Sequence, residues 1–229
     1  MKIQTLINLA DQLDDSGLVK EAAIIDDFLK TAAKNNLHPS GLKKESVEFH
    51  QKLFDGYKKA AEHYSQEYKT IMKSSEKDSP NMGALRENLA NQSHNHNGVA
   101  LHEMYFEDII NSQPCSLSEC KEAQELLKDL YDGGPKQLIK EMSRVMLTPR
   151  NGWVILNFCT LEKMLYLDIC DLHDIHPSIS SVPVLVLDMW EHAYINDFGI
   201  DKEAYFNWFL SRIDWRNFVK RTENLLNLK

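Results

Sequence analysis

The sequence lacks the features that mark membrane, secreted or nucleic-acid-binding proteins. No apolar run is long enough to span a bilayer. The 34 acidic residues outnumber the 26 lysines and arginines, giving a net charge of −8, so the clustered positive charge that a nucleic-acid backbone requires is missing. The first residues, MKIQTLINLADQLDDSGL, carry acids too early for a secretory signal peptide. We therefore expect neither a membrane nor a nucleic acid among its partners.

Cysteine is also scarce. The chain has four cysteines, with neither a CxxC pair nor the dense spacing of a disulfide scaffold. Reduced thiols in a cytoplasmic protein are the expected state. What the sequence does contain is ordinary for a globular protein: 229 residues, 43% of them hydrophobic, are enough to bury a large core.

The first half of the chain predicts helices. Residues 2–35 have helical apolar spacing on either side of a DDSG turn, which predicts an N-terminal helical extension over 1–37. Two long helices are then expected at about 43–74 and 83–111, with a polar turn between them. Because a short turn joins two long helices, we expect an antiparallel hairpin domain over 38–113.

The second half, residues 114–229, is mixed. Short runs of β-branched and aromatic residues predict three strands among amphipathic helices. Helices followed by a small sheet with flanking helices indicate an α+β fold, with an α/β C-terminal domain. The expected helices cover about 117–132, a segment running to 147, 190–197, 201–210 and 214–226, and the expected strands cover 153–159, 163–170 and 182–188.

Each hairpin helix carries a histidine on its apolar stripe. On the first helix, Val47, His50, Phe54 and Tyr57 follow steps of three and four residues, and on the second helix His102 shares a stripe with its apolar neighbours. An inward histidine is either a core residue bonded to a buried oxygen or a ligand. Periodicity alone leaves both readings open.

A further acid and histidine occur together in LDMWEHAYIND. Asp188 follows an apolar strand, and His192 lies one helical turn later. Capping of the next helix would also explain Asp188. Together with His50 and His102, however, these residues form a set of three imidazoles and one carboxylate, which suits iron, manganese or zinc. Two other histidine-containing stretches, SHNHN and DLHDIH, are expected to be solvated loops or helix ends.

The motif LDMWEHAY resembles the DxWEHAY signature of the iron/manganese superoxide dismutases. Four further segments are similar to segments of that family in the same order. These are SVEFHQK, HNGVALHEMYF, RNGWVIL and KEAYFNWFLSRIDWRNFVKR, so that the resemblance covers about residues 37–222. It implies a helical hairpin followed by an α/β domain with a three-stranded antiparallel sheet.

The resemblance also implies a chemistry. The metal ligands would be His50, His102, Asp188 and His192, holding one iron or manganese ion per chain, with water or hydroxide in the fifth position. The reaction would be the disproportionation of superoxide to oxygen and hydrogen peroxide. Trp153 and Trp190 would wall the site, and Glu191 would reach across a homodimer to His192 of the second copy. Read in isolation, Glu191 is a solvated surface acid.

Departures from the family lie around the implied ligands. Where iron enzymes usually place a glutamine, four residues before the second histidine, this chain has Gly98. Where manganese enzymes usually place a glutamine, it has Pro149. The usual gateway histidine and tyrosine are replaced by Phe54 and Lys58, and the second tyrosine of the family's EHAYY motif is replaced by Ile195. The sequence therefore does not choose between iron and manganese.

Nearby side chains offer substitutes. Tyr57, His96 and Gln92 are expected on inward faces of the hairpin, where each could donate a hydrogen bond to the bound water, although Tyr57 could simply pack in the seam. Lys58 either attracts superoxide towards the metal or is a solvated lysine. A different class of function also remains: a superoxide-dismutase-like scaffold or interaction protein that binds metal with little or no turnover. The four retained ligands favour the enzyme, and the lost gateway residues favour the scaffold.

Overall fold

A computed structural model describes residues 38, 40–74, 81–111, 114–148, 152–173 and 179–227. The chain divides into two compact units, Met1–Phe49 and His50–Lys229. The predicted N-terminal extension over 1–37 lies outside the described residues. In the first unit, the amide of Gly41 donates to the carbonyl of His38 at 2.8 Å. Gly41 has a φ of 90°, a left-handed conformation that favours glycine, so a tight turn precedes the first long helix.

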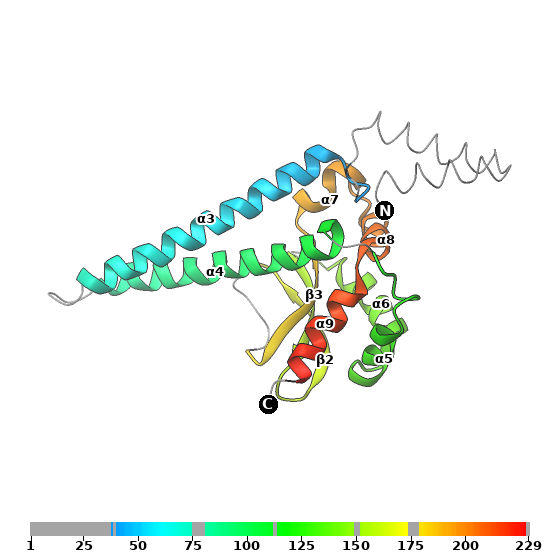
Figure 1. Cartoon of the computed structure of the whole chain (residues 1–229). Helices are drawn as coiled ribbons and strands as arrows, with labels where there is room; N and C mark the ends of the chain where they lie inside the picture. The colour runs from blue at the N-terminus through cyan, green and yellow to red at the C-terminus, as the bar shows by residue number, and fades with distance from the viewer. Residues whose placement is uncertain are drawn as a thin grey trace. The chain divides into compact units, whose positions relative to one another are not determined.

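The two long helices form the predicted antiparallel hairpin. Helix α3 spans Lys44–Ser74 and helix α4 spans Met82–Phe106, and they run side by side in Figure 1. Side chains of α4 bind the backbone of α3: the amides of Asn88 and Gln92 donate to the carbonyl of Tyr64 at 3.1 and 3.2 Å. These bonds fix the register in which the two helices face each other.

Helix α4 was expected to continue to about residue 111, but its last turn is wider. The residues Glu107–Asn111 form a π-helical turn, η1. Two successive acids of this turn reach the same cation on the last helix, since Arg221 donates to Asp108 at 2.9 Å and to Glu107 at 2.5 Å. The amide of Asn217 also donates to Asp108, at 2.9 Å. Pairing both carboxylates with one guanidinium accounts for the local departure from α-helix.

The sheet has three antiparallel strands, as predicted, and their order is β2-β1-β3. Strand β1 spans Trp153–Cys159, β2 spans Met164–Cys170 and β3 spans Ser181–Asp188. Every residue of β1 is buried, because this strand is central and has neighbours on both edges. A register shift between Leu156 and Asn157 marks a bulge against β3.

The antiparallel register gathers three chain segments at one end of the sheet. Trp153, the first residue of β1, pairs with Cys170, the last residue of β2, and with Asp188, the last residue of β3. Side chains at Asp188 and just after Cys170 therefore lie beside Trp153. The bond from the amide of Met189 to the carbonyl of Gly152, at 2.9 Å, extends the pairing one step further.

Helices complete the α+β fold around this sheet. Helices α5 (Lys121–Leu130), α6 (Gly134–Val145) and α9 (Trp215–Leu226) contact the strands (Figure 1). The helix expected from about 117 begins at Lys121, because the backbone amide and hydroxyl of Ser116 both donate to Glu119 and close a turn. None of the described helices is long and apolar enough to cross a membrane. The five helices are α5 (Lys121–Leu130), α6 (Gly134–Val145), α7 (Glu191–Phe198), α8 (Lys202–Arg212) and α9 (Trp215–Leu226).

The ion pair between η1 and α9 generates a stability prediction. Burial raises the pKa of Asp108 to about 6, against the opposing effect of Arg221. Replacing Arg221→Met leaves a buried carboxylate without its cation, so we expect a loss of about 3–5 kcal/mol in unfolding free energy at pH 8. Without Arg221 the folded carboxyl binds a proton still more tightly than at its wild-type pKa, so the deficit should shrink as the pH falls towards 6 and be small at pH 5.

Urea unfolding of the wild type and the variant at pH 8 and pH 5 measures this difference. The matched control is Lys220→Met, because Lys220 is exposed on the same helix. An equal loss for Arg221→Met at both pH values would show that packing of the arginine, and not its charge, is what matters.

Candidate metal centre

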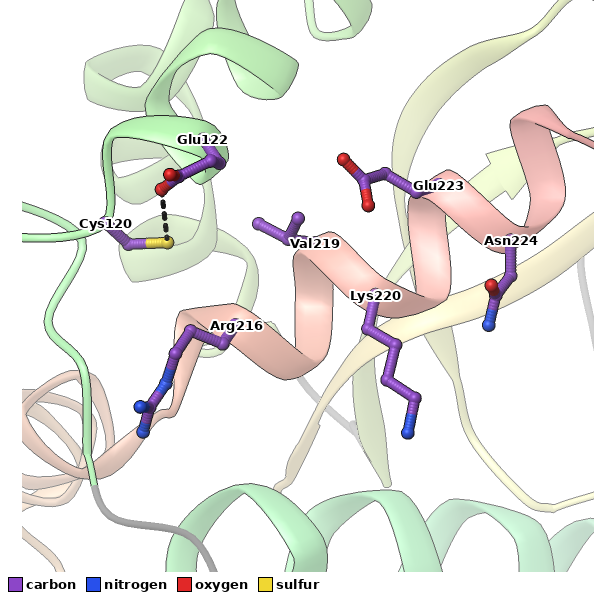
Figure 2. Close-up of a pocket in the computed structure, with 7 residues that line it drawn as sticks. All are labelled: Cys120, Glu122, Arg216, Val219, Lys220, Glu223 and Asn224. Carbon is purple, nitrogen blue, oxygen red and sulfur yellow. Dashed lines mark hydrogen bonds between the residues drawn. The ribbon is translucent and has the colours of Figure 1, made fainter.

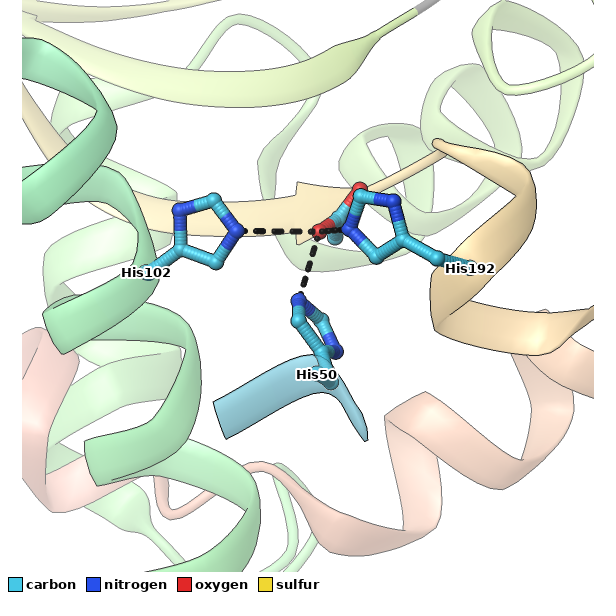
Figure 3. A group of neighbouring side chains, drawn as sticks. His50, His102 and His192 are labelled. Carbon is cyan, nitrogen blue, oxygen red and sulfur yellow. Dashed lines mark ion pairs between the residues drawn. The ribbon is translucent and has the colours of Figure 1, made fainter. Parts of the chain in front are cut away.

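Four side chains from four elements converge in the second unit. His50 comes from α3, His102 from α4, Asp188 from the end of β3 and His192 from α7. One donor atom of each residue lies within 4.8 Å of the others. Figure 3 shows the three labelled imidazoles directed towards one another. The cluster is the residue set expected from the sequence, now placed side by side.

The donor atoms face one another closely. The Oδ2 atom of Asp188 lies 3.1 Å from Nε2 of His50, 3.3 Å from Nε2 of His192 and 3.9 Å from Nε2 of His102 (Figure 3). All four atoms are buried, and none has a hydrogen-bond partner among the described residues. Buried polar atoms normally have hydrogen-bond partners, so these four atoms require a bound species between them.

The protonation of His102 shows what that centre requires. Its Nδ1 lies 2.7 Å from the carbonyl oxygen of Gly98, which can only accept, so Nδ1 carries the proton. In the neutral ring Nε2 then has only a lone pair to offer. A lone pair beside the Asp188 carboxylate is repelled unless a cation lies between them, so the donor set fits a metal ion.

Burial sets the charges of the cluster. It lowers the pKa of His102 to about 4 and also lowers the pKa of His50, in each case against the raising effect of Asp188. Burial alone would raise the pKa of Asp188, but the neighbouring imidazoles of His192 and His50 outweigh it and the net shift is downward. At neutral pH the cluster without a metal therefore holds a carboxylate and at least two neutral imidazoles, the forms that bind metal.

Asp188 is held rigidly. Its side chain is completely buried, and its Oδ1 accepts from the backbone amide of Trp190 at 2.8 Å. Its carbonyl accepts from the hydroxyl of Tyr205 at 2.7 Å, and that hydroxyl lies 3.0 Å from the hydroxyl of Tyr105. One carboxylate oxygen is thus engaged by the backbone, which leaves Oδ2 directed at the histidines. Partners of this kind orient metal ligands and exclude other rotamers.

Aromatic rings enclose the cluster, including both tryptophans expected there. Trp153 meets His102 edge to face, with ring centroids 5.1 Å apart, and Trp190 stacks against His192 at 6.5 Å. Phe54 stacks on the His102 ring at 5.9 Å. An apolar wall strengthens electrostatic interactions inside it by keeping bulk water out.

Of the three polar residues expected as extra donors, the structure brings one to the cluster. Tyr57 lies against His102, with ring centroids 5.1 Å apart, and burial, with a smaller contribution from Asp188, raises its pKa. His96 is exposed, and its Nε2 lies 3.3 Å from the hydroxyl of Ser65. Gln92 is engaged inside the hairpin, where it donates to the Tyr64 carbonyl.

Sequence reasoning missed His173. It was expected in a solvated loop, but it is only 3% exposed, and its ring centroid lies 5.7 Å from that of His102. The expectation was wrong because the stretch DLHDIH starts where β2 ends, and β2 ends beside Trp153. Strand register was the signal that could have placed His173. The neighbouring His176 and the departure at Pro149 lie outside the described residues.

The remaining residues singled out from the sequence lie at the surface. The ammonium of Lys58 sits 3.7 Å from the centroid of the Phe54 ring and 3.8 Å from a carboxylate oxygen of Asp55. Glu191, in the first turn of α7, and Ile195, one turn later, are both exposed. Lys58 is therefore linked to the cluster through Phe54, which stacks on a candidate ligand.

A second hollow, of about 300 Å³, lies between the start of α5 and helix α9. Figure 2 shows Cys120 and Glu122 across from Val219 of α9, with Glu223 further along the same helix. The cation nearest the start of α9, Arg216, already pairs with Asp214 at 2.6 Å. This hollow gathers no convergent donor set, so the histidine cluster is the stronger candidate.

Comparison with known proteins finds relatives among the iron/manganese superoxide dismutases. Residues 121–221 match the family model of iron/manganese superoxide dismutases, C-terminal domain. The chain is 27% identical to the superoxide dismutase [Fe] of Aquifex aeolicus over 207 residues, covering 86% of this chain and 93% of the relative. It is also 27% identical to superoxide dismutase [Mn] 2 of Haloferax volcanii over 146 residues, covering 64% of this chain and 69% of the relative.

Three findings lead to one conclusion. They are these matches, the three-stranded sheet that follows a helical hairpin, and the cluster of three histidines and one aspartate. The chain is similar to the iron/manganese superoxide dismutases over most of its length, and residues 121–221 match their C-terminal domain.

Proposed function

We propose that this protein disproportionates superoxide at a mononuclear iron or manganese ion held by His50, His102, Asp188 and His192. The observation that carries the proposal is the set of four buried donor atoms within 4.8 Å of one another, none of them hydrogen-bonded among the described residues. Imidazole and carboxylate ligands together suit iron and manganese. When bound, the metal would supply one-electron exchange, oxidising one superoxide to oxygen and reducing another, with two protons, to hydrogen peroxide.

The side chains around the donors have distinct tasks in this proposal. Asp188 supplies the single negative charge that faces the ion, and its fixed Oδ1 prevents the carboxylate from rotating away. Trp153 and Trp190 exclude bulk water from the ligand side of the cluster. Lys58 gives a positive charge beside Phe54 that attracts a small anion against the overall charge of −8.

The second candidate is a metal-binding scaffold or interaction protein with little turnover. It is favoured by the same region that departs from the family: Phe54 and Lys58 stand where the resemblance led us to expect a histidine and a tyrosine, and Ile195 stands where we expected a second tyrosine. Turnover by the purified, metal-loaded protein separates the two functions.

Metal content and superoxide removal test the proposal together. The wild type should retain about one iron or manganese per chain and remove superoxide. We expect His50→Ala and Asp188→Ala to lose most of the metal and about 100-fold or more of the activity, because each variant removes one of the four candidate donors. His63→Ala is the matched control, since His63 is exposed on the same helix.

Each result leads to one conclusion. Metal bound without turnover in the wild type favours the scaffold. Full metal content in the His50→Ala and Asp188→Ala variants refutes the ligand set itself. Loss of metal in His63→Ala as well would show that the assay reports general damage to the helix.

The buried imidazoles predict how the metal-free protein responds to acid. The pKa of His102 is lowered to about 4 in the folded chain, so between pH 6.5 and 4 the unfolded state binds more protons. The free energy of unfolding should therefore fall with decreasing pH in that window, by about 1.4 kcal/mol per pH unit for such a group. Urea unfolding of the metal-free protein measures this slope. His102→Leu should flatten it, and an unchanged slope in that variant would contradict the assignment.

We also propose a homodimer in which Glu191 contacts His192 of a second copy. Glu191 is exposed and immediately precedes His192 in the first turn of α7, so its carboxylate is available to a partner. Light scattering should give twice the chain mass for the wild type and a shift towards monomer for Glu191→Ala. Glu203→Ala, at an exposed acid in the first turn of α8, is the control. A monomeric wild type would contradict the dimer without affecting the metal ligands.

A further inference from the structure

His173 is a buried imidazole that the four-ligand set does not use. It is 3% exposed, and its ring meets Tyr57 at 4.6 Å, His102 at 5.7 Å and Trp153 at 5.9 Å between centroids. Trp190 lies at 6.4 Å. His173 therefore contacts one candidate ligand and both tryptophans of the wall, together with the tyrosine closest to the cluster.

The position of His173 follows from the sheet. β2 ends at Cys170, whose partner Trp153 also pairs with Asp188. Three residues after Cys170, the chain has turned over that end of the sheet and places His173 beside Trp153. The strand that carries Asp188 and the strand that leads to His173 are thus fixed by the same central residue.

Gly98 leaves the space that His173 occupies. A Cβ atom added at Gly98 would lie 2.9 Å from Nδ1 of His173 and 2.9 Å from Cδ1 of Tyr57, closer than real Cβ contacts allow. The carbonyl of the same residue accepts from Nδ1 of His102. Gly98 thus combines two roles: its carbonyl fixes the protonation of a candidate ligand, and its missing side chain admits an imidazole nitrogen.

We propose that His173 is an anion-binding residue, which offers a ring N–H to the small anion or water in the coordination position that the four side-chain donors leave open. Four protein ligands leave such a position in a redox-active iron or manganese site, and a bound anion needs a hydrogen-bond donor in an otherwise apolar wall. This inference rests on the proposed function. It assigns His173 no electron transfer and no metal bond.

Two neighbours hold the imidazole in place. Tyr57 meets its ring nearly perpendicularly, at 81°, while His94 lies 4.7 Å away with the ring planes at 38°. His94 is half-buried, so it connects the enclosed His173 to the surface of the hairpin. A ring held by two aromatic neighbours loses little further freedom when it binds an anion, and this pre-organisation strengthens binding.

Azide binding to the iron-loaded protein tests the proposal, with the dissociation constant read from visible absorption. His173→Leu should weaken azide by about tenfold or more, the usual effect of losing a hydrogen bond to a charged group, while iron content stays at the wild-type level. His173→Gln, which keeps an N–H donor, should bind azide to within about threefold of the wild type. His63→Leu is the control, an exposed histidine of α3 exchanged for the same residue.

Gly98→Ala provides a second, independent variant. Its new methyl group should push His173 and Tyr57 away and weaken azide binding while every ligand remains. If His173→Leu retains iron and binds azide like the wild type, the inference is overturned although the metal site stands. If His173→Gln is as weak as His173→Leu, the ring acts only by packing and the inference also fails. A wild type that binds no metal is a different result, because it refutes the proposed function itself.

Discussion

The structure depends on one buried carboxylate. Asp188 is completely buried at the end of β3, with Oδ2 facing three imidazole nitrogens at 3.1 to 3.9 Å. An isolated charge at such depth costs several kcal/mol. With His50 and His102 kept neutral by burial, only a cation offsets that charge fully. The hairpin helices and the sheet therefore meet at a site whose charge a bound metal ion would balance.

The rest of the second unit positions that carboxylate. The central strand β1 pairs Trp153 with Asp188 on one side and with Cys170 on the other, so both neighbouring strands end at the same place. Tyr205, on α8, holds the Asp188 carbonyl, and Gly98, on α4, holds His102. These bonds matter more for orienting Asp188 and His102 than for the free energy of unfolding. The geometry of the four candidate ligands is thus a property of the whole α+β unit.

Much of this arrangement could be predicted from the sequence, because periodicity reports which face of an element is buried. The apolar stripes placed His50 and His102 on facing helices, and the spacing of Asp188 and His192 placed them one turn apart. The π-turn after Phe106 could not be predicted, since it depends on Arg221, more than a hundred residues later. The burial of His173 and the spatial role of Gly98 were missed for a related reason.

A histidine in a polar stretch looks solvated until strand register brings it beside a tryptophan. The importance of Gly98 as an open space appears only when its neighbours are known. The most direct test of the proposed metal site is anomalous diffraction at the iron and manganese edges from crystals of the metal-loaded protein. We predict one peak per chain, bounded by three imidazole nitrogens and Oδ2 of Asp188. A peak elsewhere, or a centre without metal in protein loaded with both ions, would contradict this prediction.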